Sequence, residues 1–345
     1  MPRSSLAAST SQPMREHHHD FLSWTMNPAS SASAEWLLHS GVRARWLDYG
    51  VVELEPVDAA DDSLLLSSGV HGNETAPIEV LNAILADIAG GKLTLRCRLL
   101  VIFGNLDAMR LGKRYLDYDM NRLFNGAHAR QPDAREAARA ARLEQAAAGF
   151  FASARGRRWH YDLHTAIRGS VFEKFAIYPY IHERPHSREQ LAWLKSCQVE
   201  TVLLHSQPAN TFSYFTSRHC QADAFTLELG KARPFGQNDL SRFAGIDQAL
   251  RRLLSEPEQE LPGYRDGDLP LFQAKYDIVK HSEAFRLHLA DDVENFTALP
   301  DGFLIAEDGE HRYVAVGGEE RILFPNPTVK PGLRAGIVVE PARLP

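Results

Sequence analysis

Cysteine is scarce in this sequence, and long apolar runs are absent. The 345 residues include three cysteines, Cys97, Cys197 and Cys220, at wide spacings and without a CxxC pair. This argues against a disulfide framework and a thiolate zinc site, and it is typical of the reducing cytoplasm, where we expect the protein. Apolar runs such as residues 99–103 are short, whereas a membrane span needs about 20 residues. We expect no membrane segment and, from the polar N-terminus, no secretion signal.

An excess of basic residues is also absent. Lys and Arg number 38 against 44 Asp and Glu, a net charge of −6. Such a chain is a poor general binder of nucleic acid, although a few arginines in a pocket can still bind an anionic small molecule. Arg135, Arg139 and Arg142 can share a helix face, but Glu136 and Glu144 interrupt the run. We interpret this helix as solvated, with i,i+4 ion pairs, rather than as a nucleic-acid site.

Composition divides the chain into parts. Residues 1–34 are rich in Ser, Ala and Pro and include a tract of three histidines, so we expect a disordered leader with a solvated tract. Residues 35–257 alternate between strand and helix patterns and predict an α/β domain. The charged, proline-containing residues 256–263 indicate a linker. Residues 264–345 have frequent Gly and Pro turns and no helical period, which predicts a small all-β domain.

The predicted strands of the α/β domain are short and apolar. Strands are expected at residues 64–69, 98–103, 159–164, 173–178, 201–205 and 224–229, and helices at 73–89, 133–152 and 238–254. Short buried strands between helices predict a mixed sheet with helices on both faces, a three-layer arrangement.

The segment at residues 68–74 (SGVHGNE) contains the most informative motif. A buried strand runs into a glycine-bracketed turn and then a helix, so His71 and Glu74 can point at one place. Zinc commonly takes three ligands from His, Glu and Asp and keeps a fourth position for water. His164, at another strand end, can supply the third ligand, with Asp162 as its outer partner. By itself, the HxxE pair is equally compatible with a structural role.

A second polar segment follows Gly112. Arg114, Asn121 and Arg122 lie close together in the sequence, beside two aspartates. One interpretation is a surface loop with local ion pairs, each worth about 0–1 kcal/mol. The other is a guanidinium clamp, because the planar Arg fork matches a carboxylate in two parallel hydrogen bonds.

Glu228 lies near the end of an apolar strand. An ionised carboxylate buried there must pair, become neutral or take part in chemistry. A Glu beside a zinc-bound water can accept its proton and pass it to a leaving amine. Taken without the other motifs, a solvent-facing glutamate at a strand end fits equally well.

Together these motifs resemble a known family. HGNE at 71–74, the arginine and NR pair at 114 and 121–122, DLHT at 162–165 and TLELG at 226–230 are similar to the succinylglutamate desuccinylase and aspartoacylase branch of the zinc carboxypeptidase clan. The resemblance extends over motifs from about residue 35 to 250, and to the C-terminus in domain plan. It implies a zinc-carboxypeptidase-like three-layer α/β fold followed by a small β domain.

The resemblance also implies roles for individual residues. It implies one zinc ion per subunit, held by His71, Glu74 and His164, with Glu228 as general base and then general acid. Arg114 would stabilise the oxyanion, and Asn121 and Arg122 would hold a substrate carboxylate. Tyr214 and Arg218, fourteen and ten residues before Glu228, match substrate-binding positions of aspartoacylases.

The implied reaction is hydrolysis of N-succinyl-L-glutamate to succinate and L-glutamate, the last step of arginine degradation by the succinyltransferase pathway. The substrate has three carboxylates, for which Arg122, Arg168 and Arg218 are candidates, although Arg168 can equally cap a helix or pair with Glu173. The expected partner is thus a small N-acyl amino acid, with neither nucleic acid nor membrane. The alternatives are a deacylase of another N-acyl amino acid such as N-acetylaspartate, a carboxypeptidase, and a non-catalytic module that binds a metal or carboxylate.

Overall fold

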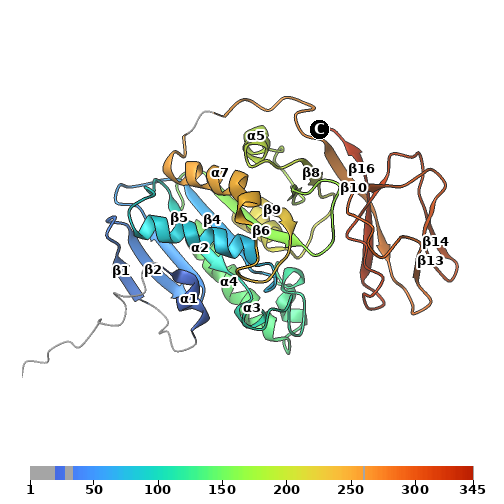
Figure 1. Ribbon diagram of the computed structural model, residues 1–345, viewed down its shortest axis with the longest axis horizontal. Coiled ribbons are helices and arrows are strands. Elements are labelled where there is room, and N and C mark those ends of the chain that lie inside the picture. The colour runs from blue at the N-terminus through green and yellow to red at the C-terminus, as the bar shows by residue number, and fades with distance from the viewer. Residues whose placement is uncertain (1–19, 28–33, 259–260, 345) are drawn as a thin grey trace, which may run out of the picture.

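The computed structural model describes residues 20–27, 34–258 and 261–344. Its helices alternate with strands up to Ser255 (Figure 1). The helices are α1 (Phe21–Met26), α2 (Thr75–Ala89), α3 (Leu106–Arg110), α4 (Arg135–Ala152), α5 (Arg188–Ser196), α6 (Phe212–His219) and α7 (Ala244–Ser255), with short 3-10 helices η1 (Met120–Arg122), η2 (Ala127–Arg130) and η3 (Leu240–Phe243). None of these described helices is both long and apolar enough to cross a bilayer.

A mixed sheet of thirteen strands forms the centre of the molecule, in the order β1-β2-β3-β5-β4-β6-β9-β7-β8-β10-β16-β15-β12. Strands β5, β4, β6 and β9 run parallel to one another, while β9 and β7 are antiparallel. The strands up to β9 are β1 (Ala34–Leu37), β2 (Arg43–Asp48), β3 (Val51–Glu55), β4 (Ser63–Ser68), β5 (Arg98–Phe103), β6 (Arg158–Ala166), β7 (Phe175–Tyr178), β8 (Thr201–Leu204) and β9 (Asp223–Lys231).

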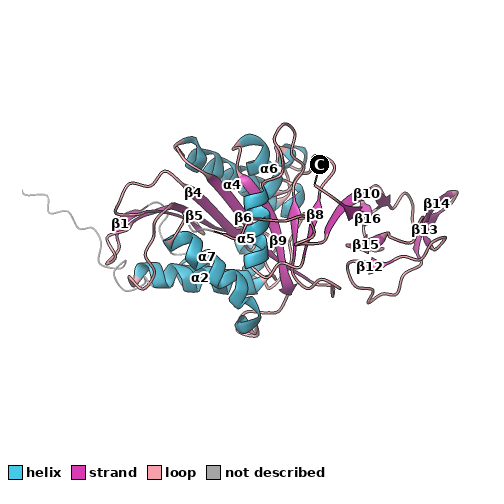
Figure 2. Cartoon of the chain, turned by 90° about the horizontal axis from the view of Figure 1, so that it is seen from above, coloured by secondary structure: helices cyan, strands magenta, loops and turns pink. Residues whose placement is uncertain are grey.

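Helices cover both faces of this sheet, which confirms the predicted three-layer α/β architecture. Figure 2 shows α4 and α6 on one side of the strands and α2 and α7 on the other. Each side has its own apolar core. The α2 and α7 side buries Leu64, Leu66, Ile84 and Leu250, and the α4 and α6 side buries Leu65, Leu100, Phe150 and Phe212. Alternate residues of each central strand therefore enter opposite cores.

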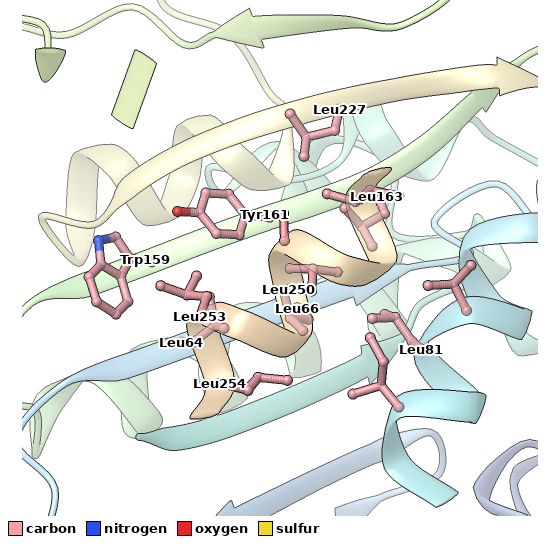
Figure 3. Packing of buried hydrophobic residues seen from close by; sticks show 14 of the residues in the cluster. Leu64, Leu66, Leu81, Trp159, Tyr161, Leu163, Leu227, Leu250, Leu253 and Leu254 are labelled. Atoms are coloured by element: carbon pink, nitrogen blue, oxygen red, sulfur yellow. The ribbon is translucent and has the colours of Figure 1, made fainter. Parts of the chain in front are cut away.

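Strand β6 shows the alternation most clearly. Trp159, Tyr161 and Leu163 point into the core beneath α7 (Figure 3). Tyr161 stacks there on Trp193 of α5, with 3.9 Å between the ring centroids. Because side chains alternate along a strand, His160, Asp162 and His164 face the α4 and α6 side instead. These three polar side chains are all buried. The apolar half of β6 thus anchors the strand, and the polar half faces the site described below.

The chain beyond the linker is all β, as predicted. It contains β10 (Leu271–Val279), β11 (Arg286–Leu287), β12 (Thr297–Ala298), β13 (Leu304–Asp308), β14 (His311–Val314), β15 (Arg321–Leu323) and β16 (Arg334–Ala342). These strands are not a detached unit, however, because β10 pairs in parallel with β8 and continues the main sheet. In Figure 1 they extend away from the helical layers, at the end of the molecule opposite α1 and β1.

Part of the predicted leader is ordered, which corrects our expectation for residues 20–27 and for residue 34. Phe21 of α1 lies 5.1 Å from both Trp46 and Phe103, measured between ring centroids. Burying such an aromatic side chain stabilises a fold by roughly 1.5–3 kcal/mol, enough to hold a short helix against the core. Asp20 caps the helix by accepting a hydrogen bond from the backbone N–H of Ser23. The histidine tract lies outside the described residues.

The core beneath α7 yields a prediction for stability. Leu250 is fully buried there, so Leu250→Ala leaves a cavity and should lower the free energy of unfolding by about 2–5 kcal/mol. Leu240, which is 42% exposed, offers a matched control, and Leu240→Ala should change little. Urea unfolding of both variants measures the difference. Equal losses of stability would contradict the proposed packing.

Candidate metal centre

The candidate site lies where three parallel strands end. Strands β4, β6 and β9 pair in register, with Ser68 opposite Leu163 and His164 opposite Glu228. Side chains at the carboxyl ends of adjacent parallel strands meet at one edge of the sheet. The turn after β4 adds His71, and the N-terminal end of α2 adds Glu74. Segments more than 150 residues apart in sequence thus converge on one place.

Gly72 makes the turn between the two motif residues possible. A Cβ atom at this position would lie 2.3 Å from the backbone nitrogen of Met109, so a side chain does not fit. Its backbone N–H donates to the carbonyl oxygen of Arg114 at 3.0 Å. The close approach therefore ties the turn that carries His71 to the segment that carries Arg114.

The three predicted ligands form a compact group. One ligand atom from each of His71, Glu74 and His164 lies within 4.8 Å of the others, and all three side chains are buried. The Nδ1 atoms of both imidazoles lie 2.9 Å from the Glu74 carboxylate, one on each oxygen. Two imidazoles and a carboxylate are a donor set that zinc takes in catalytic sites.

The hydrogen bonds of these side chains fit a metal ion. His71 Nδ1 is buried and has no hydrogen-bond partner of acceptable geometry among the described residues. Its other nitrogen, Nε2, contacts Asp119 at 2.9 Å, and Nε2 of His164 contacts Asp162 at 2.9 Å. Histidine ligands usually donate their second N–H to a carboxylate in this way. The two Nδ1 atoms, which both lie next to the Glu74 carboxylate, are therefore the ones that could face a shared ion.

Asp162 was expected from the sequence as an outer partner, whereas the contact of Asp119 with His71 was not. The backbone N–H of Asn121 also donates to Asp119, at 2.9 Å. From the sequence, Asp119 was identified only as one of two aspartates in a polar segment, with no predicted partner. Its pairing depends on the fold, which brings residue 119 beside residue 71.

Glu228 is buried beside the three ligands. Its Oε2 atom has no hydrogen-bond partner in the described part of the chain. Burial raises the pKa of Glu228, and the nearby charge of Glu74 raises it further, to about 7. His164 and Arg114 act in the opposite direction. Of the two interpretations from sequence, the structure favours a buried carboxylate over a solvent-facing one, and a pKa near neutrality suits a group that exchanges protons.

Arg114 points into the same site. Its Nη1 donates to Glu74 Oε1 at 2.7 Å. Burial acts to lower the pKa of Arg114, but the charges of Glu74, Asp119 and Glu228 outweigh burial and raise it. The guanidinium is thus held in place by the acidic groups around it. The segment is no simple surface loop at this position.

Asn121 and Arg122 lie next along the chain, in η1. Asn121 is buried, and its Oδ1 accepts from the backbone N–H of Phe212 at 3.2 Å. Arg122 is exposed. Arg334 of β16, for which the sequence gave no signal, has its pKa lowered by burial and then by the positive charge of Arg122. Positive charge from two distant parts of the chain therefore gathers at one place.

The remaining candidates occupy different surroundings. Tyr214 is buried in α6, and its hydroxyl contacts His182 Nε2 at 2.9 Å. Burial raises the pKa of Tyr214 against the opposing charge of Arg218, which is exposed in the last turn of that helix. The structure places Arg168 against the C-terminal strands, where its Nη1 donates to the carbonyl oxygens of Asp291 and Val293 at 2.5 and 3.0 Å.

The arginines of α4 have acidic partners. Arg139 and Arg142 both donate to Asp48 at 2.9 Å, and Arg135 donates to Asp117 at 2.8 Å. Arg135 therefore has a carboxylate of its own, whereas Arg139 and Arg142 share that of Asp48. The expected ion pairs are present, but the partners of these three arginines all lie outside α4 and none is at an i,i+4 position, which corrects that part of the interpretation. Arg139 is also buried rather than solvated.

Comparisons with known proteins identify the family. A model described as the Succinylglutamate desuccinylase/Aspartoacylase catalytic domain matches residues 60–254, and one described as the AstE/AspA barrel-sandwich hybrid domain matches residues 267–342. A protein of Chromobacterium violaceum named succinylglutamate desuccinylase is 69% identical over 330 residues, covering 95% of this chain and 99% of its own.

Solved structures agree with this match. The crystal structure of the succinylglutamate desuccinylase from Chromobacterium violaceum has a TM-score of 0.88 and 67% identity, with coverage of 95% of this chain and 99% of that one. The enzyme of the same name from Vibrio cholerae has a TM-score of 0.83 and 31% identity, with coverage of 94% and 98%. The chain therefore belongs to the succinylglutamate desuccinylase/aspartoacylase family.

Proposed function

We propose that this protein is a zinc-dependent hydrolase that cleaves N-succinyl-L-glutamate to succinate and L-glutamate. The observation that carries the proposal is the convergence of two imidazoles and two carboxylates, from His71, Glu74, His164 and Glu228, at one edge of the sheet. The names of relatives that match nearly the whole chain support the substrate. The reaction would complete arginine degradation by the succinyltransferase pathway, in the cytoplasm, where three buried free cysteines stay reduced.

The proposed cofactor is one zinc ion, held by His71, Glu74 and His164. When bound, zinc lowers the pKa of a coordinated water and polarises a carbonyl oxygen. The donor set has two imidazole nitrogens and a carboxylate, as in open catalytic sites that keep a fourth position for water. Asp119 and Asp162 hold the outer nitrogens of the two imidazoles and so fix the rings.

Glu228 is the proposed proton carrier. With a pKa raised to about 7, its carboxylate can accept a proton from water near neutral pH and return it to the leaving amide nitrogen. Arg114 is the proposed oxyanion donor, because its guanidinium is fixed beside Glu74 and lies in the field of Glu228. Both groups are in place before substrate arrives, so little reorganisation is required.

The substrate's carboxylates are the proposed partners of the surrounding arginines. The positive charge of Arg122 lowers the pKa of Arg334 by repulsion, while Asp277, at 3.6 Å from Arg334, acts in the opposite direction. An anion bound between them would relieve that repulsion. Arg168 is engaged with backbone carbonyls, so it is a weaker candidate than the sequence indicated.

The choice of substrate can be tested directly. The protein should hydrolyse N-succinyl-L-glutamate with a much higher kcat/KM than N-acetyl-L-aspartate, because only the former matches its close relatives' named substrate. Both rates are measured with zinc-loaded protein, by detecting the free amine of the L-glutamate or L-aspartate that is released. Turnover of the acetyl compound alone would favour the aspartoacylase alternative and contradict the proposal.

Removal of the proposed base gives a second prediction. Glu228→Gln keeps the side chain's size but cannot accept a proton, so kcat should fall by about 10²–10⁴-fold. The zinc content of the purified variant should stay at one ion per chain, because residue 228 is not a proposed ligand. Glu144→Gln, at a glutamate of α4 that bonds His128 and Gly126, is the matched control. Full activity in Glu228→Gln would show that another group carries the proton.

Removal of the proposed oxyanion donor gives a third prediction. Arg114→Ala should lower kcat by about 10²–10³-fold, as the loss of one such donor does in other enzymes. The adjacent Lys113 is exposed, so Lys113→Ala should retain activity and serves as the control. Steady-state kinetics on both variants separate kcat from KM. A rise in KM with unchanged kcat would assign Arg114 to substrate binding instead.

A further inference from the structure

A row of buried polar side chains runs back from the metal centre into the protein. Asp162 Oδ1 accepts a hydrogen bond from Ser67 Oγ at 2.6 Å. Ser67 Oγ also contacts His160 Nε2 at 2.8 Å, and His160 Nδ1 contacts Thr216 Oγ1 at 2.7 Å. Every member is at most 1% exposed. The row thus leads from a ligand's partner on β6, through β4, to helix α6.

Counting protons fixes the direction of each bond. The single hydroxyl proton of Ser67 goes to the Asp162 carboxylate, so His160 Nε2–H must donate to Ser67 Oγ. Burial is the main reason that the pKa of His160 falls to about 4, so the ring is neutral and its Nδ1 is an acceptor.

Thr216 completes the count. Its Oγ1 also lies 3.1 Å from the carbonyl oxygen of Ser213, but the shorter contact, at 2.7 Å, is with the unprotonated nitrogen of His160. The hydroxyl proton therefore goes to His160 Nδ1. Every bond in the row then runs toward the metal centre, and each group has the one partner it needs.

We propose that the side chains of Thr216, His160 and Ser67 form a directed chain of hydrogen bonds. This chain positions Asp162 and, through it, the metal ligand His164. The inference rests on the metal-binding part of the proposed function. Ser67 occupies one oxygen of Asp162 and leaves the other to accept from His164 Nε2–H at 2.9 Å. That hydrogen bond selects the tautomer whose Nδ1 lone pair faces the ion. Thr216, His160 and Ser67 are therefore positioning residues, which act on the ion only through Asp162 and His164.

Buried hydroxyls in this region offer a matched test. Ser67→Ala removes the donor to Asp162 and should weaken zinc binding by about 10–100-fold, the range found for outer partners of metal ligands. Ser213→Ala makes the same substitution at another buried serine, whose hydroxyl contacts Thr226 Oγ1 at 2.8 Å and is not part of the proposed chain of hydrogen bonds. It should leave zinc affinity unchanged. Chelator competition measures the zinc Kd of full-length protein, and thermal unfolding of the zinc-free forms reports any general loss of stability.

Thr216 supplies a second test that tolerates a failure of Ser67→Ala to fold. Thr216→Val keeps the shape but removes the donor to His160, so zinc affinity should fall by a smaller factor, and Thr216→Ser should restore it. In ¹⁵N-histidine NMR spectra, the wild-type His160 should show a proton on Nε2 only, and Thr216→Val should keep that tautomer but shift the Nδ1 resonance, because Nδ1 loses its hydrogen-bond donor.

The outcomes separate the two levels of the argument. Equal zinc affinities for Ser67→Ala and Ser213→Ala overturn the inference, as do equal affinities for Thr216→Val and Thr216→Ser. A wild-type His160 that carries its proton on Nδ1 also overturns it. A wild-type chain that binds no zinc overturns the proposed function and this inference together, whereas substrate turnover plays no part in the measurement.

Discussion

The site depends on one constraint, which is that a strand buried on both faces carries ionisable side chains on one of them. Strand β6 places Trp159, Tyr161 and Leu163 in one core and the imidazoles and carboxylate between them on the opposite side. A buried polar group is costly unless it finds a partner, so each must be hydrogen-bonded or bind an ion. Burial of the apolar side chains of β6 stabilises the fold and offsets the free-energy cost of burying its polar ones.

The same constraint explains why segments far apart in sequence must contact one another in the site, since each buried polar group needs a partner. Glu74 contacts both Arg114 and His164, and Asp119 contacts His71. Because these residues come from different elements, no single element sets the geometry of the site. Gly72 allows the segment around Arg114 to approach the turn after β4. These contacts also set the pKa values in the site. The acidic groups around Arg114 raise its pKa, and burial together with the charge of Glu74 raises the pKa of Glu228 to about 7.

Much of this arrangement could be predicted from local sequence patterns. The strands and helices of the central domain follow from apolar runs and turn residues. His164 and Glu228 lie near the ends of parallel strands, and His71 and Glu74 lie in the turn and helix start that follow another. Contacts that depend on long-range packing could not be predicted. Arg334 approaches Arg122 only because β10 and β16 extend the main sheet, and Arg168 turns to the carbonyls of residues 291 and 293 for the same reason. The order of α1 also depends on distant aromatic partners.

The pairing of β10 with β8 has a mechanical consequence. A ladder of backbone hydrogen bonds resists bending within its plane far better than a flexible tether, and the bonds between residues 169–171 and Asn295 add a second attachment. The C-terminal strands are therefore joined through backbone hydrogen bonds to the sheet whose strands bear His164 and Glu228. A hinge that swung the C-terminal strands away from the helical layers would have to break these backbone hydrogen bonds.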